Sequence, residues 1–229
     1  MIVSHRHRLI FVHIPKTGGT SVTLALEPLL GPDDIELADT PEGRKRRRRV
    51  DRTKAQGRLW KHSTLADMEG VVDPAIFGQY HIITTVRNPW DWVVSLYHWS
   101  QRQTFSHPSI ELAKTLPFVD YVRHQNTQAM MAVPVRHYLT DGQGQEHRAH
   151  FLRFNHLVAD LNRLGQRLGL TLPPLPHVNR SDHADYRQIH TSETAEIIAR
   201  AAAGDIARFG WQFGPLDQGG PLTPAQGRQ

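Results

Sequence analysis

Residues 9–21, LIFVHIPKTGGTS, decide the fold of this chain. The apolar run 9–14 is typical of a β-strand, and an apolar helical pattern begins at Val22. Two glycines between them allow the backbone to approach an anion closely and to adopt positive φ. A strand, a glycine turn and a helix N-terminus together form an architecture that binds phosphate. The turn contains Lys16, Thr17, Gly18, Gly19, Thr20 and Ser21.

The order of residues in this turn differs from that of a Walker A loop, in which the lysine follows the last glycine. Here Lys16 precedes both glycines, and no Gly-Lys pair occurs anywhere in the chain. The turn also lacks the closing glycine of a nucleophile elbow. The alternative to an anion site is a tight strand–helix turn that binds nothing, since glycine pairs are common in such turns.

Length and composition predict a globular α/β protein. The chain has 229 residues, of which 39% are hydrophobic, and we expect one domain over residues 1–213 with a disordered tail over 214–229. The absence of cysteine excludes disulfides and thiolate metal sites. No stretch approaches the roughly 20 apolar residues of a membrane span, so a cytoplasmic location is expected. The net charge of +5 favours an anionic ligand or partner.

The basic run Arg44–Arg49, RKRRRR, predicts a self-repelling, mobile loop over about residues 40–58. One interpretation is a solvated loop without a partner. The other is a surface that contacts nucleic acid, a polyanionic substrate or the phosphates of a nucleotide. No aromatic residue interrupts the run, which argues against binding to single-stranded nucleic acid.

A second informative stretch is residues 81–99, HIITTVRNPWDWVVSLYHW. Residues 82–86 are typical of a buried strand, and Asn88 and Pro89 are a good cap and first residue for the helix that follows. Arg87 therefore lies at the carboxyl end of a strand, where open α/β sheets bind ligands. Ser95 lies off the apolar face of that helix. The alternatives are an ion pair for Arg87 and an exposed position for Ser95.

Two motifs of this chain resemble those of one enzyme family. They are specific for that family when they occur together and in this order. Residues 11–21, FVHIPKTGGTS, and 86–99, VRNPWDWVVSLYHW, resemble the sulfotransferases that use 3′-phosphoadenosine-5′-phosphosulfate (PAPS). The likeness is to the carbohydrate type related to heparan sulfate 2-O-sulfotransferase and to bacterial relatives, over residues 9–213. It implies a P-loop NTPase-like three-layer α/β sandwich with a mainly parallel central sheet.

The resemblance also implies roles for individual residues. Lys16, Thr17, Gly18, Gly19, Thr20 and Ser21 would form the 5′-phosphosulfate loop. Arg87 and Ser95 match the arginine and serine that bind the 3′-phosphate, and Asn179, Arg180 and Ser181 fall where relatives close over the nucleotide. His62 matches the histidine proposed as catalytic base, with His13 and His98 as the alternatives in this sequence. Without the resemblance, a lone histidine such as His62 is usually structural or merely exposed.

The expected reaction is sulfuryl transfer from PAPS to a hydroxyl of a saccharide or similar acceptor, anionic acceptors included, with 3′-phosphoadenosine-5′-phosphate (PAP) as the product. Lys16 and the loop amides can stabilise charge on the departing phosphate oxygen. A histidine near its usual pKa of ~6.5 can accept the hydroxyl proton. We expect no metal, because no metal-binding motif is present. The alternatives are a nucleotide-dependent phosphotransferase and a basic nucleic-acid-binding protein, although no nucleic acid is expected as partner. The oligomeric state is left open.

Overall fold

The computed structural model describes residues 1–176 and 184–214, and the chain divides into two compact units. The first unit contains Met1–Val86 and the described residues from Val135 onward, up to position 176. The second unit contains Arg87–Pro134 and the C-terminal stretch 184–214. The prediction of a single domain stays a prediction, and all but the first residue of the predicted tail lies outside the described residues.

The first unit is built on a five-stranded sheet with the order β3-β1-β2-β4-β5. Strand β2 pairs with β4, and β4 with β5, in parallel, whereas β1 pairs antiparallel with both β2 and β3. Among the strands of the described residues, β1 is therefore the one that runs against the others, and the expected mainly parallel sheet is confirmed. The strands are β1 (Ile2–Ser4), β2 (Leu9–Val12), β3 (Ile35–Glu36), β4 (His81–Val86) and β5 (Ala149–Arg153).

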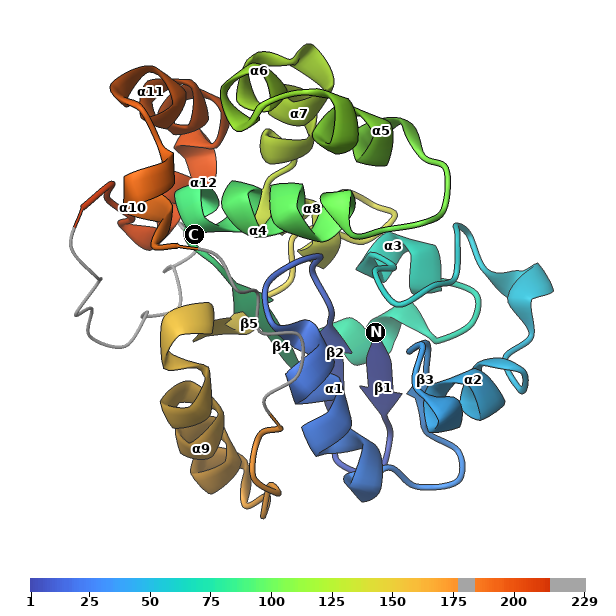
Figure 1. The fold of residues 1–229 in the computed structure, drawn as a ribbon. Coiled ribbons are helices and arrows are strands. Elements are labelled where there is room, and N and C mark those ends of the chain that lie inside the picture. Colours follow the sequence, from blue (N-terminus) through green and yellow to red (C-terminus); the bar gives the residue numbers. More distant parts are fainter. Residues whose placement is uncertain (177–183, 215–229) are drawn as a thin grey trace. The chain divides into compact units, whose positions relative to one another are not determined.

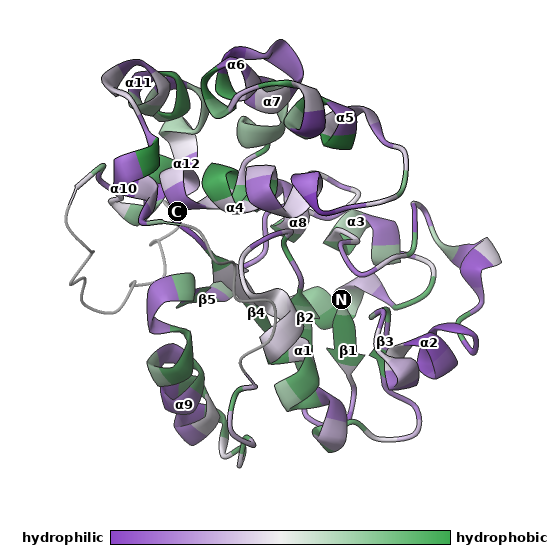
Figure 2. Ribbon diagram, viewed as in Figure 1, coloured by the Kyte–Doolittle hydropathy of each residue, from purple (hydrophilic) through white to green (hydrophobic). Residues whose placement is uncertain are grey.

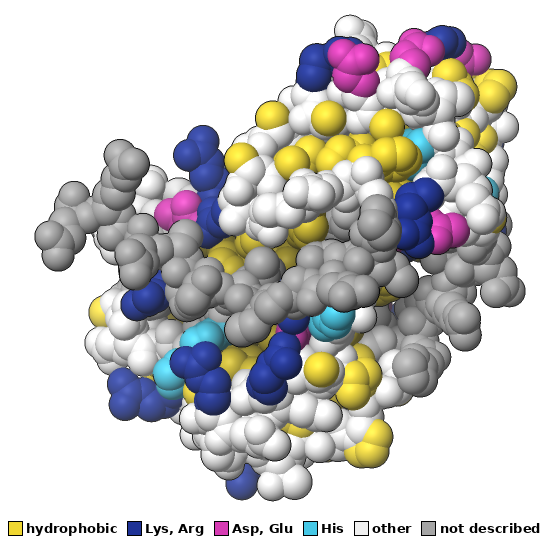
Figure 3. All heavy atoms as spheres, turned by 90° about the vertical axis from the view of Figure 1, so that its left-hand side faces the viewer, with side chains coloured by type: hydrophobic (Ala, Val, Ile, Leu, Met, Phe, Trp, Pro, Cys, Tyr) yellow, Lys and Arg dark blue, Asp and Glu magenta, His cyan; other side chains and the backbone are white. Residues whose placement is uncertain are grey.

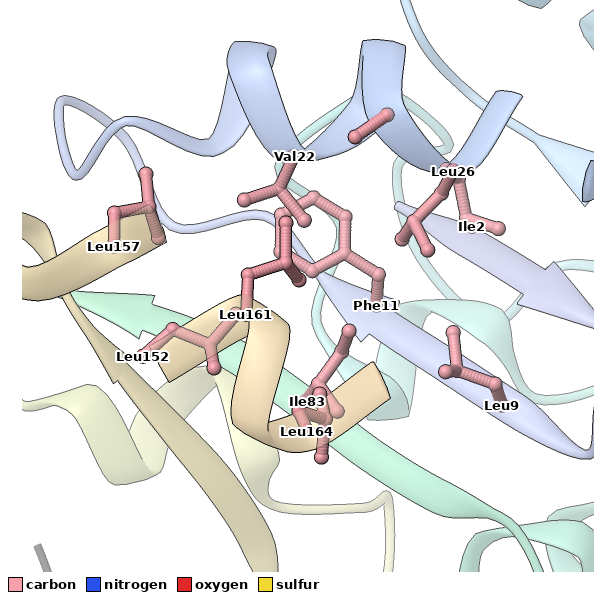
Figure 4. Packing of buried hydrophobic residues seen from close by; sticks show 11 residues of the cluster. Ile2, Leu9, Phe11, Val22, Leu26, Ile83, Leu152, Leu157, Leu161 and Leu164 are labelled. Carbon is pink, nitrogen blue, oxygen red and sulfur yellow. The ribbon is translucent and has the colours of Figure 1, made fainter. Parts of the chain in front are cut away.

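The hydrophobic core of this unit lies between the sheet and two helices, α1 (Gly19–Leu26) and α9 (Leu157–Leu168). Figure 1 shows both helices on the same face of the sheet, and Figure 4 shows their leucines and valine directed at Phe11 and Ile83. This packing follows from sequence, because alternate strand residues share one sheet face and residues three or four apart share one helix face. Burial of this face holds α1, and with it the preceding turn, against the sheet.

The opposite face of the sheet is buried as well. Ile10, Val12, Ile82 and Thr84 alternate with the residues of the first face and are at most 1% exposed. The helical segments that follow His62 and Pro134 are short, and the Ala66 amide donates to the Thr140 carbonyl at 3.3 Å between them. A sheet buried on both faces gives the three-layer α/β arrangement predicted. These segments are α3 (Leu65–Met68), η3 (Pro74–Gly78) and α8 (Val135–Leu139).

The basic run differs from the expected loop, because most of it forms helix α2 (Pro41–Arg47). Thr40 caps this helix by accepting a hydrogen bond from the Gly43 amide at 2.9 Å, and proline occupies its first position. Arg46 turns inward and donates to the Gly31 carbonyl at 2.6 Å. Figure 2 shows α2 as hydrophilic and strand β1 as hydrophobic. Local capping, the partly buried Arg46 and ion pairs from Glu42 to Lys45 and Arg46 offset the repulsion between like charges on this helix. Short 3-10 helices elsewhere in the unit are η1 (Glu27–Leu29), η2 (Arg52–Lys54) and η4 (Phe154–His156).

The second unit is helical. Its longest helix, α4 (Pro89–Gln101), begins as predicted, with the Asn88 side chain accepting from the Trp90 amide at 3.1 Å. The Trp90 indole donates to the Ala195 carbonyl at 2.9 Å and so ties α4 to α11. Basic and acidic side chains gather over α6 and α11 (Figure 3), where Arg123 pairs with Glu193 at 2.6 Å. The remaining helices are α5 (Pro108–Thr115), α6 (Phe118–Arg123), α7 (Gln125–Met131), α10 (Tyr186–Ile189), α11 (Ser192–Ala201) and α12 (Ala203–Phe209).

Candidate active site

The turn between β2 and α1 combines positive φ angles with a helix N-terminus. Lys16 has φ of 62° and Gly18 has φ of 88°, so two residues of the turn adopt the left-handed region. A lysine in this region is strained, and such strain is concentrated at functional sites. Gly18 caps α1, and the first turn of that helix carries no acidic side chain. The positive end of the helix dipole therefore meets no competing carboxylate from its own first turn.

Both glycines of the turn are required by close packing. A Cβ atom at Gly19 would lie 2.2 Å from Cδ2 and 2.5 Å from Nε2 of His13. A Cβ atom at Gly18 would lie 2.9 Å from the Phe154 ring, in addition to the strain of positive φ. The sequence indicates that the turn needs its glycines, but it does not reveal which side chains pack against them. Neither His13 nor Phe154 carries a local signal for this contact.

The hydroxyl groups of the turn have different surroundings. Thr17 is buried, and its Oγ1 donates to the Ile14 carbonyl at 2.8 Å and lies 2.6 Å from Oγ1 of Thr85 on β4. Thr17 therefore stabilises the turn from within and links it to the neighbouring strand. Ser21 is buried in the first turn of α1, and its amide donates to the Gly18 carbonyl at 3.1 Å. Thr20 and Lys16 are partly exposed.

His62 lies beside this loop in the same unit. Its Nδ1 is 2.7 Å from the backbone carbonyl oxygen of His13, which precedes Lys16 by three positions. Because a carbonyl oxygen only accepts, Nδ1 must carry the hydrogen, and Nε2 of the neutral ring is left as the basic nitrogen. The structure thus fixes the tautomer that a general base requires.

The pKa of His62 is lowered to about 4, first because burial disfavours the charged ring. The hydrogen bond to His13 and the Asp39 carboxylate act in the opposite direction, whereas Lys61 and the Met1 amine lower the pKa further. The expectation of an ordinary histidine pKa is therefore wrong for this residue. At neutral pH the free protein holds His62 as the neutral base.

His13 is the more deeply buried of the two histidines, with 5% of its surface exposed. Its ring meets the ring of His62 edge to face, with 4.7 Å between their centroids. Burial, the Met1 amine, His62 and Lys61 all lower the pKa of His13 well below its ordinary value. Trp60 packs edge to face against His62, with 4.8 Å between the ring centroids.

Arg87 and Ser95 belong to the second unit. Arg87 follows the last residue of β4, is buried, and donates from Nε and Nη2 to the two oxygens of Asp91 at 2.7 and 2.9 Å. The ion pair weighed as an alternative is therefore present. Ser95 is buried at 2% exposure rather than exposed, four residues after Asp91 on the same face of α4. His98, an alternative base, is also on α4, with its ring 5.4 Å from that of Tyr97.

Asn179, Arg180 and Ser181 lie outside the described residues. Within residues 1–176 and 184–214, no group of three or more histidine or carboxylate side chains could hold a metal ion. Across the same part of the chain, no helix has both the length and the apolar character needed to span a membrane.

Comparison with known proteins gives the family. The profile of the sulfotransferase family matches residues 1–196. No curated protein matches the chain. Among solved structures, the mouse sulfotransferase SULT7A1 complexed with PAP is similar, at 16% sequence identity and a TM-score of 0.35. That similarity covers 89% of this chain and 66% of the mouse chain. Because the profile spans most of the sequence and includes the strand–PKTGGTS–helix segment, the chain belongs to the sulfotransferase family.

Proposed function

We propose that this protein transfers a sulfuryl group from PAPS to a hydroxyl of a carbohydrate or similar acceptor, with His62 as general base. Membership of the sulfotransferase family supports the reaction class. The observation that carries the proposal is a hydrogen bond of 2.7 Å, from His62 Nδ1 to the His13 carbonyl. This hydrogen bond joins a base of fixed tautomer to His13, which directly follows β2 and leads into the proposed anion-binding loop.

The loop residues fit a 5′-phosphosulfate group. Gly18 and Lys16 turn the backbone through positive φ, and the helix that follows has no acidic residue in its first turn. Lys16 adds a positive charge, and Thr20 and Ser21 add hydroxyl donors. When bound, PAPS would supply an activated sulfuryl group on a phosphate leaving group.

The chain's own residues would then act on two oxygens. Nε2 of His62 takes the proton of the acceptor hydroxyl, whose oxygen forms the new bond to sulfur. Lys16 and the loop amides stabilise the charge on the phosphate oxygen, which keeps the electron pair of the breaking sulfur–oxygen bond. A general base contributes typically 10²–10⁴-fold to the rate.

Arg87 and Ser95 are proposed to bind the 3′-phosphate. The bidentate pair with Asp91 fixes the plane of the guanidinium group, and Ser95 shares the helix face of Asp91. Ser95→Ala should therefore weaken PAP more than adenosine 5′-phosphate in calorimetry, whereas equal losses would refute the contact. Asn179, Arg180 and Ser181 are proposed to close over the nucleotide on the family resemblance alone.

The acceptor is proposed to be a saccharide, and the basic surface of α2 and of the two residues that follow it favours an anionic one. Arg44, Arg48 and Arg49 are exposed, and their charge would attract an acidic acceptor in a salt-dependent way. A panel of neutral, uronic-acid and sulfated saccharides, assayed with labelled PAPS at two salt concentrations, identifies the class of acceptor.

Thermal shift tests the choice of nucleotide. At about one hundred times its Kd, PAP should stabilise the protein by ~2.7 kcal/mol, which raises Tm by roughly 5–10 °C without Mg²⁺. Stabilisation by ATP that requires Mg²⁺, with none by PAP, would favour the phosphotransferase instead. Stabilisation by single-stranded DNA alone would favour a nucleic-acid-binding protein.

A further inference from the structure

His13 places a polar ring directly beneath the anion-binding loop. The Cδ2–Nε2 edge of the ring lies against Gly19, where an added Cβ would be 2.5 Å from Nε2. Gly19 is the first residue of the eight-residue helix α1, whose amino end faces the loop. The proposed mechanism uses the backbone carbonyl of His13, but it gives no role to the ring.

The ring occupies a position that an apolar side chain would fill at lower cost. It is 95% buried and stacks on Phe11, with 5.7 Å between the ring centroids. Among the described residues, Nδ1 of His13 finds no hydrogen-bond partner. A buried polar atom without a partner is unfavourable and requires an explanation, of which a catalytic role is one.

The position of the single ring hydrogen follows from this environment. Burial, the largest cause of the lowered pKa of His13, keeps the ring neutral, so one of its two nitrogens carries a hydrogen. A hydrogen on Nδ1 would be a buried donor without a partner, which is rarer in proteins than an acceptor with an unused lone pair. The hydrogen therefore belongs on Nε2, at the ring edge that lies against Gly19.

We propose that His13 is a second functional histidine, which donates a hydrogen bond from Nε2 to the anionic oxygen held by the loop. This inference rests on the proposed function. It assigns His13 and His62 opposite tasks, since one donates a hydrogen and the other accepts a proton. A neutral imidazole is a suitable donor because it can stabilise developing negative charge without releasing its hydrogen.

The test compares two variants of similar volume. His13→Leu removes the donor and also removes the unpartnered nitrogen, so the free protein should gain stability, with Tm rising by about 2–4 °C. His13→Gln places an amide donor near the position of Nε2. We expect His13→Leu to lower kcat by about 10- to 100-fold and His13→Gln to recover most of that loss. His13→Phe serves as the apolar variant if His13→Leu does not fold.

Calorimetry with PAP identifies which oxygen accepts the proposed hydrogen bond from Nε2 of His13. If the hydrogen bond goes to the 5′-phosphate, the apolar variant weakens PAP about 10- to 100-fold. If it goes to the transferred sulfuryl group, PAP affinity stays unchanged while kcat falls. An apolar variant that is more stable than wild type, with unchanged PAP affinity and unchanged kcat, overturns the inference. Absence of PAPS-dependent transfer by the wild-type protein would instead overturn the proposed function.

Discussion

The contact between His13 and Gly19 predicts that a single methyl group in the loop is destabilising. In an ordinary helix, replacing glycine by alanine stabilises by roughly 0.5–1 kcal/mol. At Gly19 the new Cβ would lie 2.2 Å from Cδ2 of His13, closer than real Cβ atoms come. The ring of His13 cannot simply move aside, because His62 packs against it at 4.7 Å between centroids.

Overpacking of this kind costs about 1–3 kcal/mol, and the crowded ring places Gly19→Ala at the upper end. After subtraction of the helix-propensity gain, the net loss is about 2 kcal/mol, or a fall in Tm of roughly 4–8 °C. In a His13→Ala background the clash is absent. The same change at Gly19 should then stabilise by about 0.5–1 kcal/mol.

A double-mutant cycle measures this coupling directly. Urea unfolding of wild type, both single variants and the double variant should give a coupling of about 2–3 kcal/mol between the two positions. Gly78→Ala is the matched control in the same unit, because an added Cβ there meets nothing within 4 Å. Its effect should stay within about 0.5 kcal/mol. If Gly19→Ala changes stability equally with and without the His13 ring, the contact does not constrain the loop.

Lys16→Ala should abolish transfer while Tm stays within a few degrees of wild type, since this loop side chain is partly exposed; unchanged turnover would remove its role. For wild type, kcat/KM should rise with pH through the pKa of His62, about 4, because the base must be unprotonated. The rise of kcat with pH should lie at a higher pH than the rise of kcat/KM, since a bound anion favours the protonated ring of His62. A pH–rate profile in which kcat and kcat/KM rise at the same pH would contradict this expectation. Arg87→Gln should weaken PAP by about 10- to 100-fold in calorimetry and adenosine 5′-phosphate far less; equal losses exclude a 3′-phosphate contact. Arg46→Ala should lower Tm because it loses the hydrogen bond to the Gly31 carbonyl. Arg48 is exposed, so Arg48→Ala should leave Tm unchanged and only raise KM for an anionic acceptor, most at low salt. Equal losses of Tm in the two variants would contradict a structural role for Arg46 alone.

Local signals in the sequence are sufficient for the parts of the fold that depend on neighbours along the chain. The glycine turn before α1 and the Asn88–Pro89 start of α4 both form where predicted. Each depends on residues within one or two turns, such as the Asn88 side chain that accepts from the Trp90 amide. Thr40 and Pro41 are a similar cap and first residue for α2, but the run of positive charge that follows them in the sequence favours a loop.

The surroundings of the candidate base depend on contacts between distant segments, which the sequence does not reveal. His62 and His13 are 49 positions apart, and the bond between them sets the tautomer of His62. The lowered pKa of His62 has the same origin, because it follows from burial in the folded unit. A resemblance to known enzymes can select His62, but only the folded chain determines which of its nitrogens is basic.

Our proposal of His62 rather than His13 as the base rests on the same contacts. Two rings 4.7 Å apart in a buried site cannot both carry a charge at low cost, so a proton taken from the acceptor must reside on one of them. His62 has a carbonyl that already accepts from Nδ1 and continues to do so after Nε2 is protonated, which stabilises the imidazolium. His13 is the more deeply buried ring, and its Nδ1 has no acceptor within the described chain. A charge on His13 would therefore be uncompensated, and this is why we propose His62 rather than His13 as the base.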